Sequence, residues 1–393
     1  IYAHLDESII STQDIGLLAP SMAAYDEEYR IRGTISGKIS NLDARDIQLW
    51  LKRGSYLSGN LSFNGLPNIK ETFMNLNLRN SSIRVRDLQP YLDSKEYKRL
   101  SQIGDLRLTA NLIGFPTDFV AVGTFGTAFG TVRADLNFKI EGTRGLPAYV
   151  GNMTLSDFEL GKVSNRPDLI QKINLKGQVA GEGISPETAS IKVDVQLQES
   201  GINRYVFDSL RIKGRFESES FTGSVEIKDP NLRFTGEGTV NLQEDMERFL
   251  FSARLDTIML EKLGWTDESL HAHIAQLNLD FNGLDPDQIV GTARLHDSYI
   301  SYQERDLRVD YIKSIRADSI RTLSWKSDRL AADLEGDYNL RELYANLRQL
   351  LHEYTLNYYN REDDIRAYYS AERPVPSRFV ANYAVRFSNI DPF

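Results

Sequence analysis

The stretch that decides the fold is residues 31–39, which read Ile-Arg-Gly-Thr-Ile-Ser-Gly-Lys-Ile. Apolar and polar side chains alternate around its glycines. The same phrase returns, with variation, at residues 173–179, 210–216 and 277–283. Because alternate side chains of a β-strand point to opposite faces, each copy is apolar on one face and polar on the other. Many such strands in series predict a long sheet with one continuous apolar face.

Period-two alternation extends well beyond these copies. Residues 190–198 place Ile191, Val193 and Val195 on one face, and residues 131–141 do the same with Val132, Leu136 and Phe138. Strands of this kind recur between Gly, Asn and Asp turns, which is typical of all-β proteins. Clean alternation favours an antiparallel sheet with one solvated face over a parallel α/β core. We therefore predict an all-β fold, one long curved, mostly antiparallel sheet with a few short helices.

Composition limits the classes of function. The chain has 393 residues, 41% of them hydrophobic, which is typical of a folded protein. Its net charge of −9 argues against a broad nucleic-acid interface, and without cysteine it has no disulfide or thiolate chemistry. No apolar run is long enough to cross a bilayer as a helix. Because the chain begins at Ile1, we expect a piece of a longer protein, with any inner-membrane anchor outside it.

Helical periodicity is clear in one place. From Asn339 to Asn360, apolar residues recur at intervals of three and four, which predicts an amphipathic helix. Such a helix could pack on the sheet, plug an apolar groove or lie on a membrane. A shorter helix is possible at 94–103. The expected organisation is a β-groove sheet over 1–337, this helix over 338–360, and a charged, Pro-containing linker over 361–393 with a final strand near 381–387. The residues expected to plug the groove or pack are Leu343, Leu347, Leu351 and Tyr354.

The sequence offers little that resembles a catalytic or metal site. His271 and His273 would share one face of a strand, but no third ligand follows at a recognisable spacing, so a polar sheet face is the favoured interpretation. The glycine-rich run 123–130 precedes a strand, whereas a phosphate-binding loop opens a helix, so a tight bend is favoured there. We expect no enzyme activity, no cofactor and no metal.

Three stretches resemble TamB-like proteins of Bacteroidota, members of the AsmA-like, repeating-β-groove superfamily. They are residues 221–242, residues 31–51 followed by 59–69, and residues 112–132. The resemblance implies a sheet rolled into a taco-like groove with an apolar inside. It implies a periplasmic location, with attachment to the inner membrane and reach to the outer membrane. Phospholipid transport and contact with a BamA-like outer-membrane barrel are further implications of this resemblance.

The leading hypothesis is a groove that moves phospholipid between the two membranes and so contributes to outer-membrane biogenesis. Its ligands would be acyl chains, which gain about 0.8 kcal/mol for each buried methylene. A scaffold for outer-membrane protein assembly, pairing client strands at exposed edges, is the main alternative. A membrane barrel is a third. The residues expected by alternation to line the groove are Val132, Leu136, Phe138, Ile191, Val193, Val195, Leu277, Leu279 and Phe281.

Overall fold

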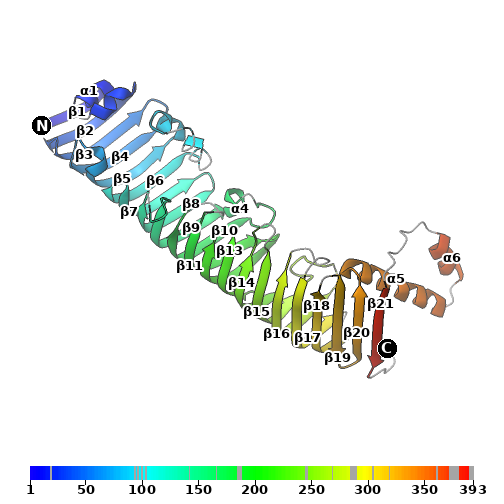
Figure 1. Ribbon diagram of the computed structural model, residues 1–393. Coiled ribbons are helices and arrows are strands. Elements are labelled where there is room, and N and C mark those ends of the chain that lie inside the picture. Colours follow the sequence, from blue (N-terminus) through cyan, green and yellow to red (C-terminus); the bar gives the residue numbers. More distant parts are fainter. Residues whose placement is uncertain are drawn as a thin grey trace. The chain divides into compact units, whose positions relative to one another are not determined.

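A computed structural model gives the fold (Figure 1). It describes most of the chain, and the statements below concern those residues. The residues outside the description are 18–19, 93, 95–96, 99–100, 102–103, 141, 165, 184–187, 244–246, 268, 284–289, 303–304, 318, 360–361, 371–379 and 389–393. The chain is all-β, as the alternation predicts, and it divides into two compact units, Ile1–Glu219 and Ser220–Phe393.

Unit 1 is an antiparallel meander in which each strand pairs with the next along the chain. Short helices at the sheet's rim join some of these strands (Figure 1). The strands are β1 (Tyr2–Ser11), β2 (Glu28–Lys38), β3 (Asn41–Leu51), β4 (Tyr56–Asn64), β5 (Phe73–Ile83), β6 (Leu106–Phe115), β7 (Asp118–Thr127), β8 (Gly130–Lys139), β9 (Ala148–Glu159), β10 (Lys172–Glu182), β11 (Ser190–Ile202) and β12 (Tyr205–Glu217). The helices are α1 (Thr12–Gly16), η1 (Pro20–Ala24), η2 (Ile69–Glu71), α2 (Val85–Leu88), η3 (Gln89–Tyr91) and α4 (Leu160–Val163).

Unit 2 continues the same plan with sequential antiparallel pairs. Two longer helices separate its last two strands. The strands are β13 (Ser220–Lys228), β14 (Leu232–Asn241), β15 (Arg248–Met259), β16 (Leu270–Asn282), β17 (Val290–Tyr302), β18 (Arg305–Ala317), β19 (Ile320–Ser327), β20 (Leu330–Asp337) and β21 (Val380–Phe387). The helices are α5 (Leu340–Tyr359) and α6 (Glu362–Ser370).

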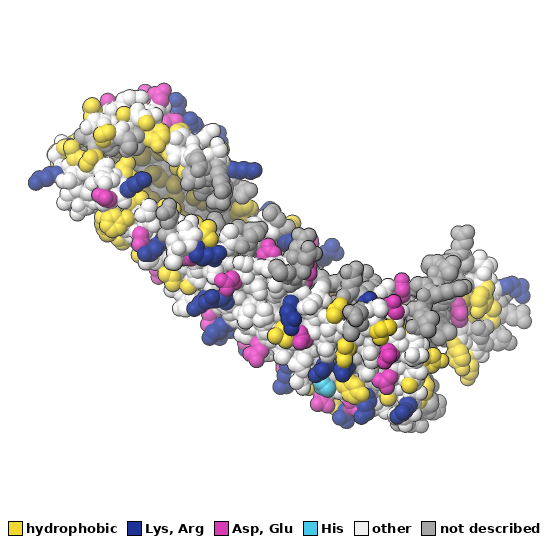
Figure 2. All heavy atoms as spheres, in the orientation of Figure 1, with side chains coloured by type: hydrophobic (Ala, Val, Ile, Leu, Met, Phe, Trp, Pro, Cys, Tyr) yellow, Lys and Arg dark blue, Asp and Glu magenta, His cyan; other side chains and the backbone are white. Residues whose placement is uncertain are grey.

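The sheet of unit 1 is strongly curved. Leu78, Ala110 and Val195 are at most 6% exposed, although they belong to a single-layer sheet. A flat single layer would leave both faces open to water, so burial of this depth requires neighbouring strands to wrap around the apolar face. Figure 2 shows hydrophobic side chains gathered inside a hollow of this unit, with charged side chains around it. The hydrophobic core of unit 1 is therefore the floor of a trough.

Recurring β-bulges help to bend the strands. Glu7, Asn80, Glu199 and Asp297 each adopt a positive φ at the middle of a strand, on β1, β5, β11 and β17. In β1 and β5 the pairing register shifts at this point. An inserted residue with left-handed backbone bends its strand and increases the local twist. These bulges all fall on odd-numbered strands, four or six strands apart.

The sequence predicts some local elements well and misses others. The helix expected from Asn339 to Asn360 is α5, and the strand expected at 381–387 is β21. Residues 362–370 form the helix α6. The charged composition predicts a linker there, and it does so because the short amphipathic segment is interspersed with charged residues. The helix proposed for 94–103 falls largely outside the described residues. Gly123 and Gly126 lie inside β7, and Gly130 opens β8, so the bend in the glycine-rich run is the short hairpin turn between those strands.

Candidate functional site

One cross-strand row of unit 1 defines the trough. Because directly paired residues of adjacent strands share a face, the register can be followed from strand to strand. Every position in this row, called here the apolar row, is aliphatic or glycine. Its members, from β1 to β12, are Ala3, Ile35, Ala44, Leu61, Leu76, Leu112, Ala121, Leu136, Gly151, Val179, Val193 and Gly214.

The predicted lining residues of unit 1 lie on one face. Leu136 and Val193 belong to the apolar row itself. Phe138 and Ile191 lie one row toward the hairpin side, and they are linked through Tyr149 of β9 and Gly181 of β10. The remaining two, Val132 and Val195, lie in rows on the other side of the apolar row. The register therefore brings together residues that are far apart in the sequence, although their contact with a ligand stays a prediction.

The predicted residues of unit 2 lie in three parallel rows. Leu277 pairs with Ala253 and Leu295, and this row stays apolar up to Val385 of β21. The next row contains Leu279, and the row beyond it contains Phe281. Phe281 stacks on Phe249 of β15 with ring centroids 4.9 Å apart. Unit 2 thus has an apolar face of its own, made in the same way.

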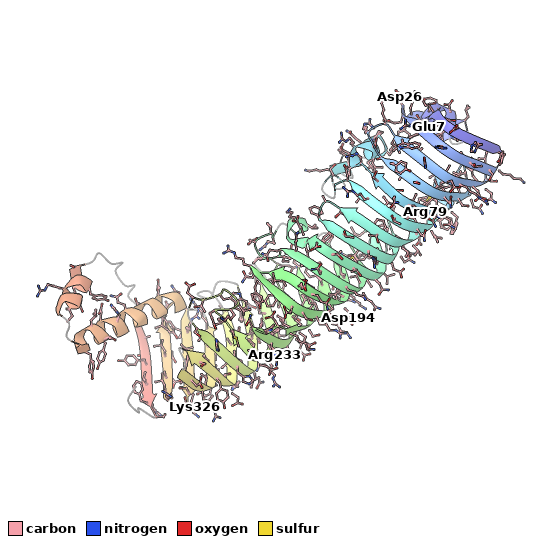
Figure 3. All side chains as sticks on the ribbon, turned by 180° about the vertical axis from the view of Figure 1, so that it is seen from behind. Glu7, Asp26, Arg79, Asp194, Arg233 and Lys326 are labelled. Atoms are coloured by element: carbon pink, nitrogen blue, oxygen red, sulfur yellow. The ribbon has the colours of Figure 1, made fainter. Side chains whose placement is uncertain are left out.

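The opposite face of each strand is polar. On β11, Lys192 and Asp194 alternate with the apolar-row face, and Asp194 accepts from Arg211 of β12 at 3.1 Å. Figure 3 labels Asp194, and Arg79 of β5, which lies on this outer face beside Leu78. Ion pairs this exposed add at most about 1 kcal/mol each. Their main effect is to make the outer face compatible with water while the inner face remains apolar.

Glycines in the apolar row coincide with a depression of about 550 Å³ over β9 to β12. Its lining includes the apolar-row residues Gly151, Val179, Val193 and Gly214. The residues on either side of them along the same strands also line it, and these include Lys192, Asp194, Lys213 and Arg215. A Cβ at Gly151 would lie 2.1 Å from the carbonyl oxygen of Asp135, so this position admits only glycine. The close approach of β8 and β9 therefore requires that Gly151 has no side chain. The glycines of the apolar row also leave more open space along that row than larger residues would.

Sequence reasoning did not find the bulges, although a signal was present. The tetrapeptide Leu-x-(acidic or Asn)-Ser occurs at residues 5–8, 78–81, 197–200 and 295–298, and its third residue is the bulge each time. The serine that follows is buried at 81, 200 and 298, where its hydroxyl bonds to backbone carbonyls. The motif is hard to recognise because its copies are unevenly spaced, four or six strands apart.

Neighbouring strands supply side chains that stabilise the bulges. Asn174 of β10 lies between two bulged strands and bonds to both. Its Oδ1 accepts from the backbone N–H of Asp157 at 2.9 Å, and its Nδ2 donates to the carbonyl of Glu199 at 3.3 Å. Asn60 of β4 accepts in the same way from the N–H of Asp46, at 2.8 Å. Bulges leave backbone groups outside the regular ladder, and these amides satisfy them.

The first turn of α5 packs against the protein, and a later turn does not. Leu343 is 8% exposed, and Tyr338, just before the helix, is 2% exposed. Tyr354 is 71% exposed, so it does not fill a groove in this structure. The side chains of Leu347 and Leu351 lie outside the described set. Burial of Leu343 shows that the start of this helix is packed, while its role as a plug of the groove stays a prediction.

The two histidines on β16 have separate partners. His271 Nε2 lies 2.6 Å from Glu261 Oε1, and His273 Nδ1 lies 3.0 Å from the carbonyl oxygen of Asp256. Partial burial acts to raise the pKa of Glu261, but the hydrogen bonds from His271 and from the Leu270 amide, with the charge of His271, lower it below its ordinary value. In the described residues no three His, Asp or Glu side chains are grouped to hold a metal. Among the helices described, none is long and apolar enough to span a bilayer.

Comparison with known proteins returns no relatives. No protein-family model matches the chain, and neither the characterised proteins nor the solved structures include a significant match. The geometry of the trough and the sequence resemblance given above are the observations that bear on its function.

Proposed function

We propose that this protein carries the acyl chains of phospholipids along its apolar trough. The observation that supports this most directly is the apolar row of unit 1, which crosses all of its strands with no polar side chain. The members of the row are half-buried or buried rather than exposed, and the half-buried ones keep part of an apolar surface open along the row. A continuous apolar surface that is left partly open normally marks a binding surface. Among the described residues, Figure 1 shows the short helices of unit 1 at the rim of its sheet.

The energetics fit transport without catalysis. A sixteen-carbon chain that leaves a membrane loses burial worth about 12 kcal/mol, at about 0.8 kcal/mol for each methylene. An apolar trough restores most of this, so movement along it is close to isoenergetic. Successive strands offer equivalent rungs about 4.8 Å apart, which permits stepwise sliding. No proton transfer or nucleophile is needed, and the direction of transport must come from a source or a sink at the ends.

The place of action proposed is the periplasm of a Gram-negative cell. The resemblance to TamB-like proteins supports this, with attachment to the inner membrane and reach to the outer membrane. On that proposal the substrate is membrane phospholipid, and a BamA-like barrel is a partner at the outer membrane. The protein would contribute to outer-membrane biogenesis by supplying lipid.

Site-specific photocrosslinking tests the lipid proposal. A photoreactive amino acid at Leu136, Val193 or Leu279 should capture phospholipid in cells, whereas one at Lys192 or Asp194 should not. Val193 lies between Lys192 and Asp194 on β11, so the inner-face probe and its two outer-face controls are adjacent residues of one strand. Equal capture on the two faces, or capture of protein alone from the inner face, would overturn the proposal.

A second candidate is supported by the edge strand β21. In the described residues it pairs only with β20, and its Tyr383, Val385 and Phe387 are 45–78% exposed. An unpaired strand edge can accept another strand by β-augmentation. A scaffold for outer-membrane protein assembly would use such an edge to hold client strands. Backbone-directed crosslinks from β21 to an unfolded barrel protein would favour this function over lipid transport.

A further inference from the structure

The depression over β9 to β12 opens on the outer face of unit 1, opposite the trough. Most of its lining side chains, including Lys192 and Arg215, alternate with the apolar row along their strands and so project to the other face. Ile191 and Val195, the inner-face neighbours of Val193 on β11, do not line it. We call this space, with its outward-pointing side chains, the outer depression.

Positive charge dominates the outer depression. Lys192, Lys213 and Arg215 line it, and among the described lining residues Asp194 is the one acidic side chain (labelled in Figure 3). Asp194 already accepts from Arg211 at 3.1 Å and lies 3.9 Å from the Nζ of Lys213. Three cations and one carboxylate give the lining a charge of +2, whereas the whole chain carries −9. This place therefore attracts anions although the protein as a whole repels them.

Two of these cations face each other across neighbouring strands. Lys192 of β11 and Arg215 of β12 are direct cross-strand partners, an arrangement that is unfavourable for like charges. The carboxylate nearest to Arg215 is that of Glu217, at 3.8 Å, and both side chains are exposed. Lys192 forms no ion pair within the described part of the chain. An anion that contacts both side chains would replace their repulsion with two attractive contacts.

The rest of the lining fits a polyhydroxylated ligand. Asn152 and Gln178 are cross-strand partners, and their amides can each donate to and accept from hydroxyl groups. Val150, 54% exposed, and Ala180 offer a small apolar surface beside them. The volume of about 550 Å³ lies within the range of small-molecule sites and exceeds what a lone phosphate ion needs. The described lining has no aromatic ring on which a nucleobase could stack, which favours a sugar over a nucleotide.

We propose that the outer depression binds a phosphorylated sugar. Arg215 holds the phosphate through paired hydrogen bonds from its guanidinium group, and Lys192 adds a second positive charge. Asn152 and Gln178 bind the sugar hydroxyls, and the ring lies against Val150. Because the depression and the trough are on opposite faces of the sheet, this binding site goes beyond the lipid proposal and does not depend on it.

A titration of the full chain with glucose 6-phosphate, followed through methyl signals in NMR, tests the site. The methyl signals of Val150 and Ala180, on the outer face, should shift as the ligand is added. Those of Val193, which points to the inner face, should stay in place. Glucose and inorganic phosphate are the reference probes. We expect glucose 6-phosphate to bind about tenfold or more tightly than either, because only this ligand contacts both the cations and the amides.

Variants identify the side chains responsible. The variant R215Q should weaken the binding of glucose 6-phosphate about tenfold and leave the weak binding of glucose unchanged. R215K should recover only part of the affinity, because one ammonium cannot form the paired hydrogen bonds of a guanidinium group. R133Q is the matched control. Arg133 is an exposed arginine of β8 on the same face, outside the lining, and its loss should leave the affinity at the wild-type value.

Four outcomes would overturn the inference, and each leaves the lipid trough untouched. No methyl shift with glucose 6-phosphate would show that the outer depression is empty surface. Equal affinity for glucose 6-phosphate and inorganic phosphate would show an anion site with no part for the sugar. Equal losses in R215Q and R133Q would show general attraction by surface charge. Shifts at Val193 as large as those at Val150 would place the ligand on the wrong face of the sheet.

Discussion

The glycines at the floor of the trough give the sharpest test of the fold. Gly59 of β4 lies between Ile47 and Leu78 in the cross-strand register. Its φ is +154°, and an added Cβ would lie 1.9 Å from the carbonyl oxygen of Asn77. That oxygen belongs to the backbone of β5, so it cannot move aside without breaking the β4–β5 ladder. Gly59→Ala should therefore destabilise unit 1 through the backbone.

The expected cost can be built from two parts. A non-glycine residue in this backbone region costs about 1–3 kcal/mol, and overpacking against a fixed neighbour costs about as much again. We expect a total of about 4 kcal/mol. With an unfolding slope of about 2 kcal/mol per molar urea, the midpoint should fall by about 2 M.

Two other glycines of unit 1 provide controls. Gly145 has a φ of +68°, and an added Cβ would have no other atom within 4 Å, so Gly145→Ala should cost only about 1 kcal/mol of backbone strain. Gly126 has an ordinary φ, and the nearest neighbour of an added Cβ would be 3.6 Å away, so Gly126→Ala should be neutral or stabilise by about 0.5 kcal/mol. Urea unfolding followed by far-ultraviolet circular dichroism gives the order. The reasoning is refuted if Gly59→Ala shifts the midpoint no more than Gly145→Ala.

Three further predictions concern polar contacts. Asn174→Ala should cost about 1 kcal/mol and speed hydrogen exchange at the Asp157 amide, which loses its acceptor; unchanged exchange there would contradict the bulge assignment. Asp87→Ala should cost about 3 kcal/mol by thermal unfolding, because this buried carboxylate accepts from two backbone N–H groups of the 53–55 turn at 2.7 and 2.8 Å; a cost below about 1 kcal/mol would show that water replaces it. His271→Ala should raise the pKa of Glu261 toward its ordinary value in an NMR titration. Because the pKa of Glu261 is lowered in the folded state, its carboxylate stabilises the fold above the unfolded-state pKa, and this stabilisation is lost as the pH falls through the folded-state pKa. An unchanged Glu261 pKa in the variant would exclude His271 as the cause of the shift.

Much of the trough could be predicted from single strands. Alternation at residues 190–198 and 131–141 correctly identifies which side chains share a face, because that face is set by the two-residue repeat of one strand. The α5 helix was equally accessible, since its 3.6-residue repeat is local. The bulges are harder to predict. One inserted left-handed residue shifts the apolar–polar alternation by one position, and in the sequence this shift cannot be distinguished from an ordinary irregularity of the pattern.

Residue patterns alone specify an antiparallel all-β chain with one apolar face and an amphipathic helix near residue 350. How that face is used depends on the folded molecule. Strand pairing aligns Leu136 with Val193, wraps the sheet of unit 1 around its own apolar side, and sets Lys192 opposite Arg215. These features escape sequence reasoning because the direction of a side chain depends on its own strand, whereas register and curvature depend on hydrogen bonds and close contacts between strands.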